Sequence, residues 1–375
     1  MQKISTKIVH LTSVHKPFDI RIYYKECRSL AKKGYEVVLI APHEREEESG
    51  SVKIVPVSMG RGRVRRILIT VPCVLFKALR ERANVYHYHD PELMVIGIIL
   101  SLLGKKVIYD MHENVPKDIL TKGWIPKMFR NPLSRMFTVI QRILLSGTSV
   151  VFAEHSYVKD YEWVRNKIVV LNTPIVEMLD VVEMPAQKDR SVAYIGGVCC
   201  ERGSVSTLKA LSMLKDDGVE VGFECVGSLS PEHGKELSGY INTFNLRRIS
   251  IHGYLRPEVA WERAARCMAG LAILDAIPNY RESYATKMFE YMALELPIIV
   301  SDFPIYRAIV DEENCGMYIN PGSIEELAQC IRWIVDNPVK AREMGRNGRR
   351  AVLEKYNWHM DSDKLMGFYN QMKHS

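Results

Sequence analysis

The sequence predicts an α/β protein with two tandem domains, each built on an open parallel sheet. Its 375 residues, 47% hydrophobic and 25% charged, suit two globular domains. Short β-branched runs alternate with amphipathic stretches along most of the chain, as parallel sheets with helical crossovers require. A polar, proline-containing stretch at residues 173–190 interrupts this rhythm and is interpreted as a linker. We therefore expect two Rossmann-like domains, at residues 1–175 and 176–357.

The first series of elements has strands at KIVHL, EVVLIAP, NVYHYHD, KKVIYDMHE, SVVFAEHSYVKDY and IVVLNTP. Helical patterns cover Tyr23–Lys33 and Leu93–Leu103 between them. The second series has strands at SVAYIGGV, VGFECVGSL, ISIHGYL, AGLAILDA, PIIVSD and GMYIN. Its helices are expected near residues 207–215, 257–268, 288–294 and 324–356. The last helical pattern, at residues 358–375, has no strand of the second sheet left to cover.

Composition and charge restrict where the chain works. Eight cysteines form no C-x-x-C pair, which favours a reducing compartment, and neither a leader pattern nor a bilayer-spanning apolar run occurs. A cytoplasmic location is expected. The net charge of +7 is uneven: residues 1–172 carry 28 basic against 16 acidic residues, and residues 173–375 carry 23 against 28. The first half is therefore expected to face an anionic partner.

Two segments of that first half combine basic residues with apolar faces. Residues 61–82 contain seven basic residues and one acidic residue, and residues 122–142 contain five basic residues, no acidic residue and interspersed aromatics. Such segments suit docking on the anionic inner face of a cell membrane. The plainer alternative is a pair of helices that pack on the sheet and expose their charges. Nucleic acid is not expected, since no recognition motif accompanies the charge.

In open α/β sheets, ligands bind beyond the carboxyl ends of the strands, and with two such domains the expected site is the cleft between them. The stretch from Glu282 to Glu290 lies at one such end. Thr286 is a suitable N-cap, so Lys287 and Glu290 fall in the first turns of a helix whose amino end attracts a diphosphate. A carboxylate such as Glu290 can accept both hydroxyls of a ribose. The plainer alternative is a solvated helix start with two surface glutamates.

Besides the E-x7-E pattern of Glu282 and Glu290, ordered blocks cover nearly the whole chain: HKPFDIRIYYKECRSLAKKGYEV, VYHYHDPEL, VIYDMHEN, YIGGVCCERG, DAIPNYRESYATKMFEYMA and EMGRNGRRAVLEKYNW. Together they resemble the retaining glycosyltransferases of family 4, which have the fold called GT-B. The resemblance implies a nucleotide diphosphate sugar as donor substrate, no further cofactor and no metal. It also implies that residues 358–375 form a helix that packs back on the first domain.

The resemblance implies a role for several donor-site residues. Glu282 would bind hydroxyls of the sugar and Glu290 those of the ribose. Arg202 and Lys287 would neutralise the diphosphate and stabilise it as it leaves. The backbone of the glycine loops would approach the nucleotide, with Gly196 and Gly197 near the phosphates and Gly227 and Gly253 near the base. The chain departs from the family in three places: Val198 or Gly197 stands where a first arginine is usual, Glu295 stands where a helix-ending glycine is usual, and the loop at His15–Arg21 lacks the paired glycines of many relatives.

The first half offers polar residues at the carboxyl ends of its strands. His112 is the candidate for a polar group near the reacting sugar, by resemblance, and His89 and Asp90 are candidates to orient the acceptor. Asp19 and Arg21 could bind the acceptor or brace each other. Each histidine could equally be a packed core residue. Metal ligation is less expected, because no H-x-x-x-H spacing occurs.

The sequence thus predicts a hexosyltransferase-type enzyme of polysaccharide biosynthesis, peripheral to the membrane, that transfers a sugar to a glycan or lipid-linked acceptor. Two alternatives stay open: a GT-B sugar-nucleotide epimerase, and a non-catalytic glycan-binding subunit. The base, the sugar, the acceptor and the oligomeric state are not encoded in any recognisable pattern.

Overall fold

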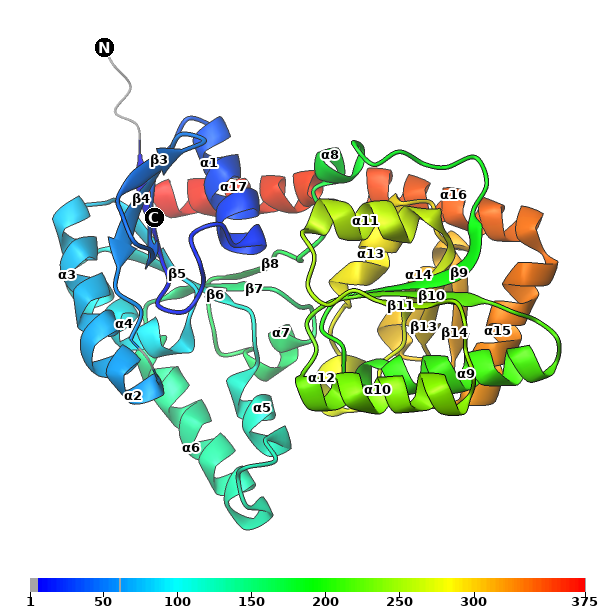
Figure 1. Cartoon of the computed structure of the whole chain (residues 1–375). Helices are drawn as coiled ribbons and strands as arrows, with labels where there is room; N and C mark the ends of the chain where they lie inside the picture. Colours follow the sequence, from blue (N-terminus) through cyan, green and yellow to red (C-terminus); the bar gives the residue numbers. More distant parts are fainter. Residues whose placement is uncertain (1–5, 61, 375) are drawn as a thin grey trace. The chain divides into compact units, whose positions relative to one another are not determined.

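A computed structural model describes residues 6–60 and 62–374 (Figure 1). The chain divides into two compact units. The N-terminal unit comprises residues up to Asn172 together with those from Trp358 onward, and the C-terminal unit comprises Thr173–Asn357. Both are α/β structures with parallel sheets, as the sequence predicts.

The N-terminal unit is built on an eight-stranded sheet with the strand order β3-β4-β2-β1-β5-β6-β7-β8. Its strands are β1 (Lys7–Leu11), β2 (Glu36–Pro42), β3 (Glu47–Ser49), β4 (Val52–Val57), β5 (Val85–Tyr88), β6 (Lys106–Met111), β7 (Ser149–Phe152) and β8 (Lys167–Val169). Neighbours are parallel except β3 and β4, an antiparallel edge pair that the sequence analysis missed. Strand order reverses between β1 and β5, and such a switch point is where ligands bind in sheets of this kind.

Helices connect the strands of this unit. They are η1 (Ile20–Cys27, π-helical), α1 (Arg28–Lys32), α2 (Arg63–Arg65), η2 (Arg66–Thr70), α3 (Val71–Glu81), η3 (Pro91–Leu93), α4 (Met94–Leu102), α5 (Val115–Thr121), α6 (Lys127–Leu144), α7 (Tyr157–Asp160) and α17 (Trp358–His374). Helix η1 begins three residues before its predicted start at Tyr23, because the Asp19 carboxylate caps it by accepting the backbone N–H groups of Arg21 and Ile22. In the part of the chain that is described, no helix is long and apolar enough to cross a bilayer.

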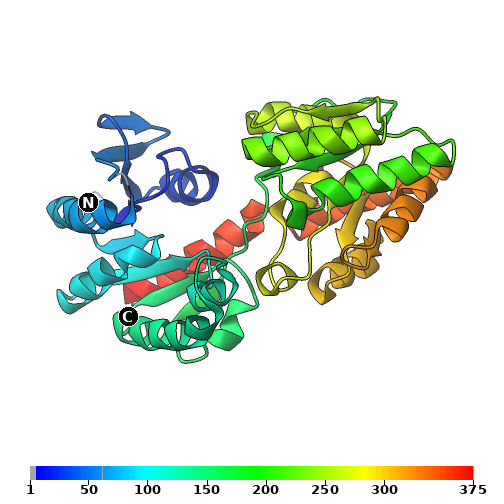
Figure 2. The same cartoon turned by 60° about the horizontal axis from the view of Figure 1, so that its bottom comes forward.

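The C-terminal helix belongs to the N-terminal unit (red in Figure 2). The Trp358 indole N–H donates to the Lys25 carbonyl (3.1 Å) and to the Ser29 hydroxyl (2.9 Å). Further along the helix, the hydroxyl of buried Tyr369 lies 2.6 Å from Nδ1 of His87 on β5. These contacts join segments more than 280 residues apart, and they explain why this helix leaves the second sheet.

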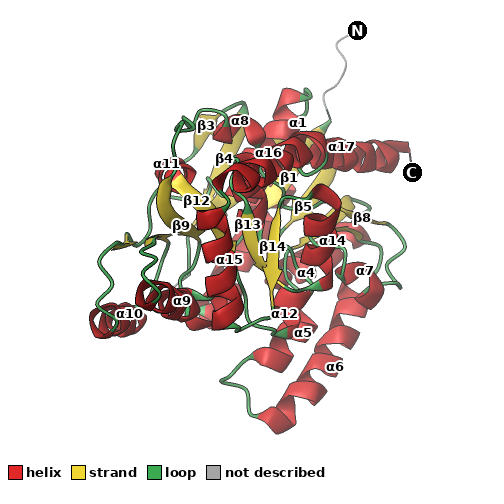
Figure 3. Cartoon of the chain, turned by 90° about the vertical axis from the view of Figure 1, so that its right-hand side faces the viewer, coloured by secondary structure: helices red, strands yellow, loops and turns green. Residues whose placement is uncertain are grey.

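The C-terminal unit has six parallel strands in the order β11-β10-β9-β12-β13-β14. They are β9 (Asp189–Ile195), β10 (Gly222–Val226), β11 (Ile249–Ile251), β12 (Cys267–Ala272), β13 (Ile298–Ser301) and β14 (Gly316–Ile319). Helices cover both faces (Figure 3), which is why strands such as IIVS read as continuous apolar runs. Strand order reverses between β9 and β12, so this unit too has a switch point.

The helices of the C-terminal unit are α8 (Val176–Leu179), η4 (Cys200–Arg202), α9 (Ser204–Asp216), α10 (Pro231–Thr243), α11 (Pro257–Arg266), α12 (Pro278–Arg281), α13 (Thr286–Ala293), α14 (Pro304–Glu313), α15 (Ile324–Asp336) and α16 (Pro338–Glu354). The prediction of one helix over residues 324–356 is wrong. The helix is interrupted at Asn337, because Pro338 has no N–H to continue a helix but suits the first turn of a new one.

Candidate functional site

A cavity of about 340 Å³ lies at the switch point of the C-terminal sheet. The loops after β9 and β12 and the start of α13 supply its walls. Its lining residues are Ile195, Gly196, Arg202, Leu274, Tyr280, Ser283, Tyr284, Ala285, Thr286, Lys287, Glu290 and Tyr306. Four predicted donor-site residues are therefore brought together here: Gly196, Arg202, Lys287 and Glu290.

A larger cavity, about 580 Å³, is lined by residues at the amino ends of β9 and β12, including Asp189, Met268 and Glu295. Ligands of open parallel sheets bind at the opposite, carboxyl ends of the strands. The smaller cavity is therefore the better candidate.

Glycines bring the ends of three strands into contact beside the smaller cavity. The Gly196 N–H donates to the Val226 carbonyl (2.9 Å), and the Gly227 N–H donates to the Gly253 carbonyl (2.7 Å). Gly227 has φ +155°, and a β-carbon added to it would lie 1.6 Å from the Gly196 carbonyl oxygen. Only glycine fits there. Gly227 and Gly253 thus shape the loop behind Gly196 and do not line the cavity themselves.

Lys287 is the buried cation of this site. Its side chain is 8% exposed, and its Nζ has no hydrogen-bond partner among the described residues. The ammonium group lies 3.5 Å from the ring centroid of Tyr194 and close to Gly196. Burial, reinforced by the nearby charge of Arg202, lowers the pKa of Lys287 from 10.5 to about 7. A cation held in this way gains most from an incoming anion.

Helix α13 adds a second source of positive potential. Its first N–H groups have no partner within the helix, and its dipole is positive at this end. The prediction that Thr286 is the N-cap is wrong: Ala285 is the N-cap, no side chain caps the helix, and Thr286 is its first residue. The Ala285 N–H donates to the Tyr306 hydroxyl (3.0 Å), which fixes the entry to the helix.

Arg202 ends the short helix η4 opposite Lys287. Its Nε donates to the Tyr280 hydroxyl (3.2 Å), and the guanidinium lies 5.4 Å from the centre of that ring. A β-carbon at Gly197 would lie 3.6 Å from Nη1 of Arg202, so this loop lies against the arginine. One side of the guanidinium is thus anchored, and its remaining N–H groups can serve an anionic ligand.

The two glutamates of the predicted motif differ in position. Glu290 lines the cavity one turn after Lys287 and is partly buried. Glu282 follows α12, is exposed, and does not line the cavity.

Ser301 supports the loop after β12, because its hydroxyl bonds both the N–H and the carbonyl of Leu274 (2.6 and 2.7 Å).

Two tyrosines of this site were not predicted from the sequence. Tyr194 precedes the glycine loop on β9 and lies under Lys287, and Tyr280 lies in the block after β12. Tyr280 could have been predicted, because it belongs to the block after β12 that was already proposed as part of the site. Tyr194 could not, because its sequence context is that of an ordinary core residue of a strand.

In the N-terminal unit, two of the predicted acceptor residues, Arg21 and His89, form a buried network with Asp110 near the switch point. The Arg21 guanidinium donates two hydrogen bonds to the Asp110 carboxylate (both 2.8 Å), and both residues are buried. This partner keeps the pKa of the Asp110 carboxyl well below its usual range, against the effect of burial. The Arg21 guanidinium is thus held by Asp110, and Arg21 bonds the Asp19 carboxylate only through its backbone N–H (2.9 Å).

Asp19 and Asp90 both brace backbone. Besides capping η1, Asp19 lies 3.3 Å from Nδ1 of His15. Asp90 is 3% exposed and accepts hydrogen bonds from the Thr12 hydroxyl (2.8 Å) and the Ser13 N–H (2.5 Å). It thereby fixes the loop that follows β1.

His89 and His112 differ in accessibility. His89 is 2% exposed, and its Nδ1 lies 3.2 Å from an Asp110 oxygen. The side chain of His112 is 22% exposed, and its Nε2 lies 3.0 Å from the same oxygen. Of the two histidines, His112 is the one whose side chain a ligand of this unit can reach.

The chain matches two family models. Residues 21–173 match the family described as "Glycosyltransferase Family 4", and residues 182–351 match "Glycosyl transferases group 1". Together the matches cover most of both units and indicate a GT-B glycosyltransferase of these families.

Curated proteins similar to this chain include three bacterial transferases. Alpha-D-kanosaminyltransferase of Streptomyces kanamyceticus is 23% identical over 182 residues, 48% of this chain and 45% of that protein. The capsular polysaccharide biosynthesis glycosyltransferase CapM of Staphylococcus aureus is 19% identical over 179 residues, with the same coverage. D-rhamnosyltransferase WbpZ of Pseudomonas aeruginosa is 22% identical over 284 residues, 72% of this chain and 69% of that protein. The matched region thus spans about half the length of the first two relatives.

Solved structures match nearly the whole chain. Sucrose-phosphate synthase from Thermosynechococcus elongatus has a TM-score of 0.77 and 17% identity, and the match covers 98% of this chain and 99% of that one. Anabaena Alr3699/HepE in complex with UDP and glucose has a TM-score of 0.75 and 14% identity, with 98% and 100% covered. At such identities the likeness shows the fold, which is the two-domain α/β fold called GT-B.

Proposed function

We propose that this chain, which matches glycosyltransferase family models in both of its units, transfers a sugar from a nucleotide diphosphate sugar to an acceptor hydroxyl with retention of configuration. One observation carries the proposal. Among the described residues, the Lys287 ammonium group has no hydrogen-bond partner, and it is buried beside Gly196, Arg202 and the first turn of α13. A diphosphate supplies the anionic oxygens that this arrangement needs.

The chemistry follows from the charges. As the bond between the anomeric carbon and the diphosphate breaks, negative charge develops on the leaving oxygen, where Lys287 and Arg202 stabilise it. The acceptor oxygen attacks the same face of the sugar, and its proton passes to the departing diphosphate. This route needs no protein nucleophile. Glu290, at the cavity, binds the ribose hydroxyls, and Glu282 binds hydroxyls of the donor sugar.

We assign the acceptor to the N-terminal unit, with His112 as the polar group that meets the reacting sugar. The acceptor is a glycan on a lipid carrier, and the proposal rests on two exposed apolar surfaces flanked by basic residues. On α2–α3, Val64 and Leu68 are 71% and 69% exposed. On the loop before α6 and on α6 itself, Trp124 and Met128 are 73% and 74% exposed. The hairpin of α5 and α6 also projects from its sheet (Figure 1).

A transfer assay tests the function. The full chain is incubated with a panel of nucleotide sugars and bacterial membrane extracts, and both nucleoside diphosphate release and glycan products are followed. Arg202→Ala and Lys287→Ala are expected to lower turnover by about 100-fold or more each. Arg332→Ala, which alters an exposed ion pair of the same unit, is the control. Near-normal transfer by the Arg202/Lys287 double variant would contradict the mechanism.

The same assay separates the alternatives. A sugar-nucleotide epimerase isomerises the donor without an acceptor. A glycan-binding subunit binds the donor and releases no diphosphate. No specific feature of the site favours either one.

Liposome sedimentation tests the membrane partner. Vesicles with anionic lipid are expected to bind the chain at low salt and to release it at high salt, since the attraction is screened. A Trp124→Ser/Met128→Ser variant is expected to bind several-fold more weakly, with Val339→Ser, another exposed apolar residue, as control. Binding that ignores both lipid charge and these substitutions would refute the docking surface.

A further inference from the structure

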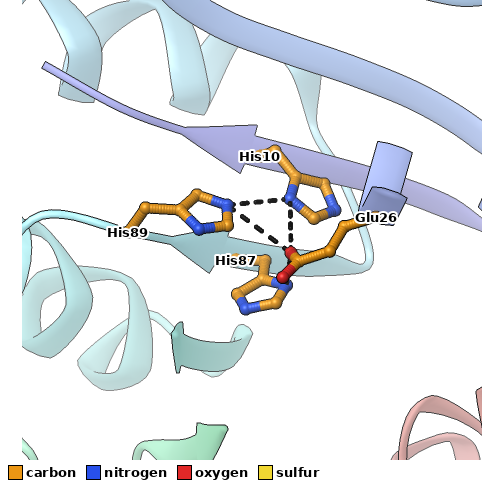
Figure 4. Close-up of side chains that lie close together, drawn as sticks. All are labelled: His10, Glu26, His87 and His89. Atoms are coloured by element: carbon orange, nitrogen blue, oxygen red, sulfur yellow. Dashed lines mark hydrogen bonds and ion pairs between the residues drawn. The ribbon is translucent and has the colours of Figure 1, made fainter. Parts of the chain in front are cut away.

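Three histidines and a glutamate converge inside the N-terminal unit (Figure 4). His10 lies on β1 directly beside His87 on β5, and His89 follows β5 on the same face, two residues on. Glu26 on η1 points at all three rings. Side-chain atoms able to bind a metal, one from each residue, lie within 4.8 Å of one another.

The distances between these atoms are those of a small coordination shell. Glu26 Oε2 lies 3.7 Å from His10 Nδ1, 3.7 Å from His87 Nδ1 and 3.9 Å from His89 Nε2. His10 Nδ1 and His89 Nε2 are 3.0 Å apart. A tetrahedral zinc ion with bonds of about 2.0–2.1 Å separates its ligand atoms by about 3.3–3.4 Å. These four distances lie within about 0.6 Å of that value, and the remaining two, from His87 to the other histidines, are no longer than 4.8 Å.

We propose that His10, Glu26, His87 and His89 bind a structural zinc ion. Neither carboxylate oxygen of Glu26 has a hydrogen-bond partner among the described residues, although the side chain is fully buried. Arg21 lies 3.3 Å away, but its two strong hydrogen bonds go to another carboxylate. A buried carboxylate that has to share a cation with a second carboxylate is unfavourable, and a divalent ion at this point lowers that cost.

Neighbouring side chains orient the ligands as in known zinc sites. With Nε2 of His89 on the metal, its Nδ1 faces the Asp110 carboxylate at 3.2 Å, and Arg21 fixes that carboxylate in turn. On the other side, the Tyr369 hydroxyl lies 2.6 Å from His87 Nδ1 and must turn when this nitrogen binds the ion. The ion would thus tie β1, β5 and η1 together beneath α17.

The four ligands are 0–2% exposed, so the shell is closed and offers no open position to a substrate. Structural zinc sites have this character, whereas catalytic ones keep a position for water. The role we assign is therefore stabilisation of the N-terminal unit, independent of sugar transfer.

Metal analysis of the full chain tests the site. The protein is purified without a polyhistidine tag or chelator, and zinc is measured by mass spectrometry, with about one ion per chain expected. It is then unfolded with chelator and refolded with zinc, with cobalt or without metal. Zinc is expected to raise Tm, and cobalt to give the intense visible bands of a tetrahedral site. Refolded wild-type protein that binds neither metal, or whose Tm ignores both, overturns the proposal.

Variants locate the ion. Glu26→Gln and His87→Ala are expected to reduce bound zinc to about a tenth or less, while exposed His359→Ala retains it. His112→Ala and Cys200→Ser test the two other groups able to hold a metal. Zinc that is lost only in one of these two variants contradicts the assignment. If the cluster variants do not fold, the cobalt spectrum decides, because thiolate charge-transfer bands would reveal a site at Cys200 instead.

Discussion

Replacing Lys287 by methionine is expected to stabilise the C-terminal unit and to weaken diphosphate binding. Burial lowers the pKa of Lys287 from 10.5 to about 7. Each pKa unit corresponds to about 1.4 kcal/mol, so keeping this lysine buried costs about 4–5 kcal/mol near neutral pH. Methionine retains the apolar stem but loses the contact with the Tyr194 ring. We expect the free energy of unfolding to rise by about 2–4 kcal/mol.

The gain should depend on pH in one direction. Between pH 7 and 10.5 the unfolded chain binds more protons at this lysine than the folded chain, so the stability of the wild type rises with pH. The advantage of the methionine variant is therefore largest below pH 7 and falls to about 2 kcal/mol or less by pH 9.

Urea denaturation at pH 6, 7 and 9 measures the difference. Lys355→Met is the control, since Lys355 pairs with Glu312 and Glu313 at the solvent-screened surface and its loss should change stability little. If Lys287→Met is less stable than the wild type at every pH, the ammonium group is a structural contact and not a preformed anion site.

Three further predictions concern stability and can be measured by denaturation or calorimetry. Gly227→Ala forces a β-carbon into a backbone carbonyl and should destabilise the C-terminal unit by about 3 kcal/mol or more; a loss below 1 kcal/mol would show that the loop can move aside. Glu295→Gly should stabilise the chain by up to about 1 kcal/mol, because Glu295 holds a left-handed φ of 54°, and a lower Tm would contradict this. Asp110→Asn should cost about 3–5 kcal/mol, because it leaves Arg21 buried without its charge partner, whereas Asp302→Asn in an exposed pair should cost under about 1 kcal/mol; equal losses would refute the distinction.

The strand framework could be predicted from sequence because each unit alternates apolar strand runs with amphipathic helices. Runs such as EVVLIAP and PIIVSD are recognisable as strands from their own residues, and the ends of these runs locate the loops of the site. The edge pair β3–β4 was not predicted, because its strands are short or interrupted by polar residues and Pro56. The end of the helix at Asn337 was not predicted, because the helical period of apolar residues continues past it, although Pro338 indicated a break.

The cavity of the C-terminal unit was predictable for a different reason. Its charged residues, Arg202, Lys287 and Glu290, all follow strand ends, where parallel sheets bind ligands. Tyr194 was not predictable, because a tyrosine within a strand looks like any core residue. Its contact with Lys287 depends on how β9 and α13 pack.

The interior of the N-terminal unit was the least predictable part. The strand period puts His87 and His89 on one face, but it does not say which face is covered. The Tyr369 hydroxyl comes from a helix more than 280 residues away, and no local pattern encodes that contact. As a result, the sequence did not reveal that His89, predicted to orient the acceptor, lies in the buried network.

Titration calorimetry with nucleoside diphosphates, from pH 7 to 9, tests the central claim that Lys287 binds the leaving diphosphate. The pKa of Lys287 is about 7 in the protein without ligand. Above pH 7, binding of the diphosphate must therefore be accompanied by protonation of Lys287. The affinity of the wild type should then fall by up to about tenfold per pH unit, with a heat that depends on the buffer. Lys287→Met should bind at least about tenfold more weakly at pH 7 and lose the pH dependence. Equal affinity in both proteins, or wild-type binding without proton uptake, would contradict the account.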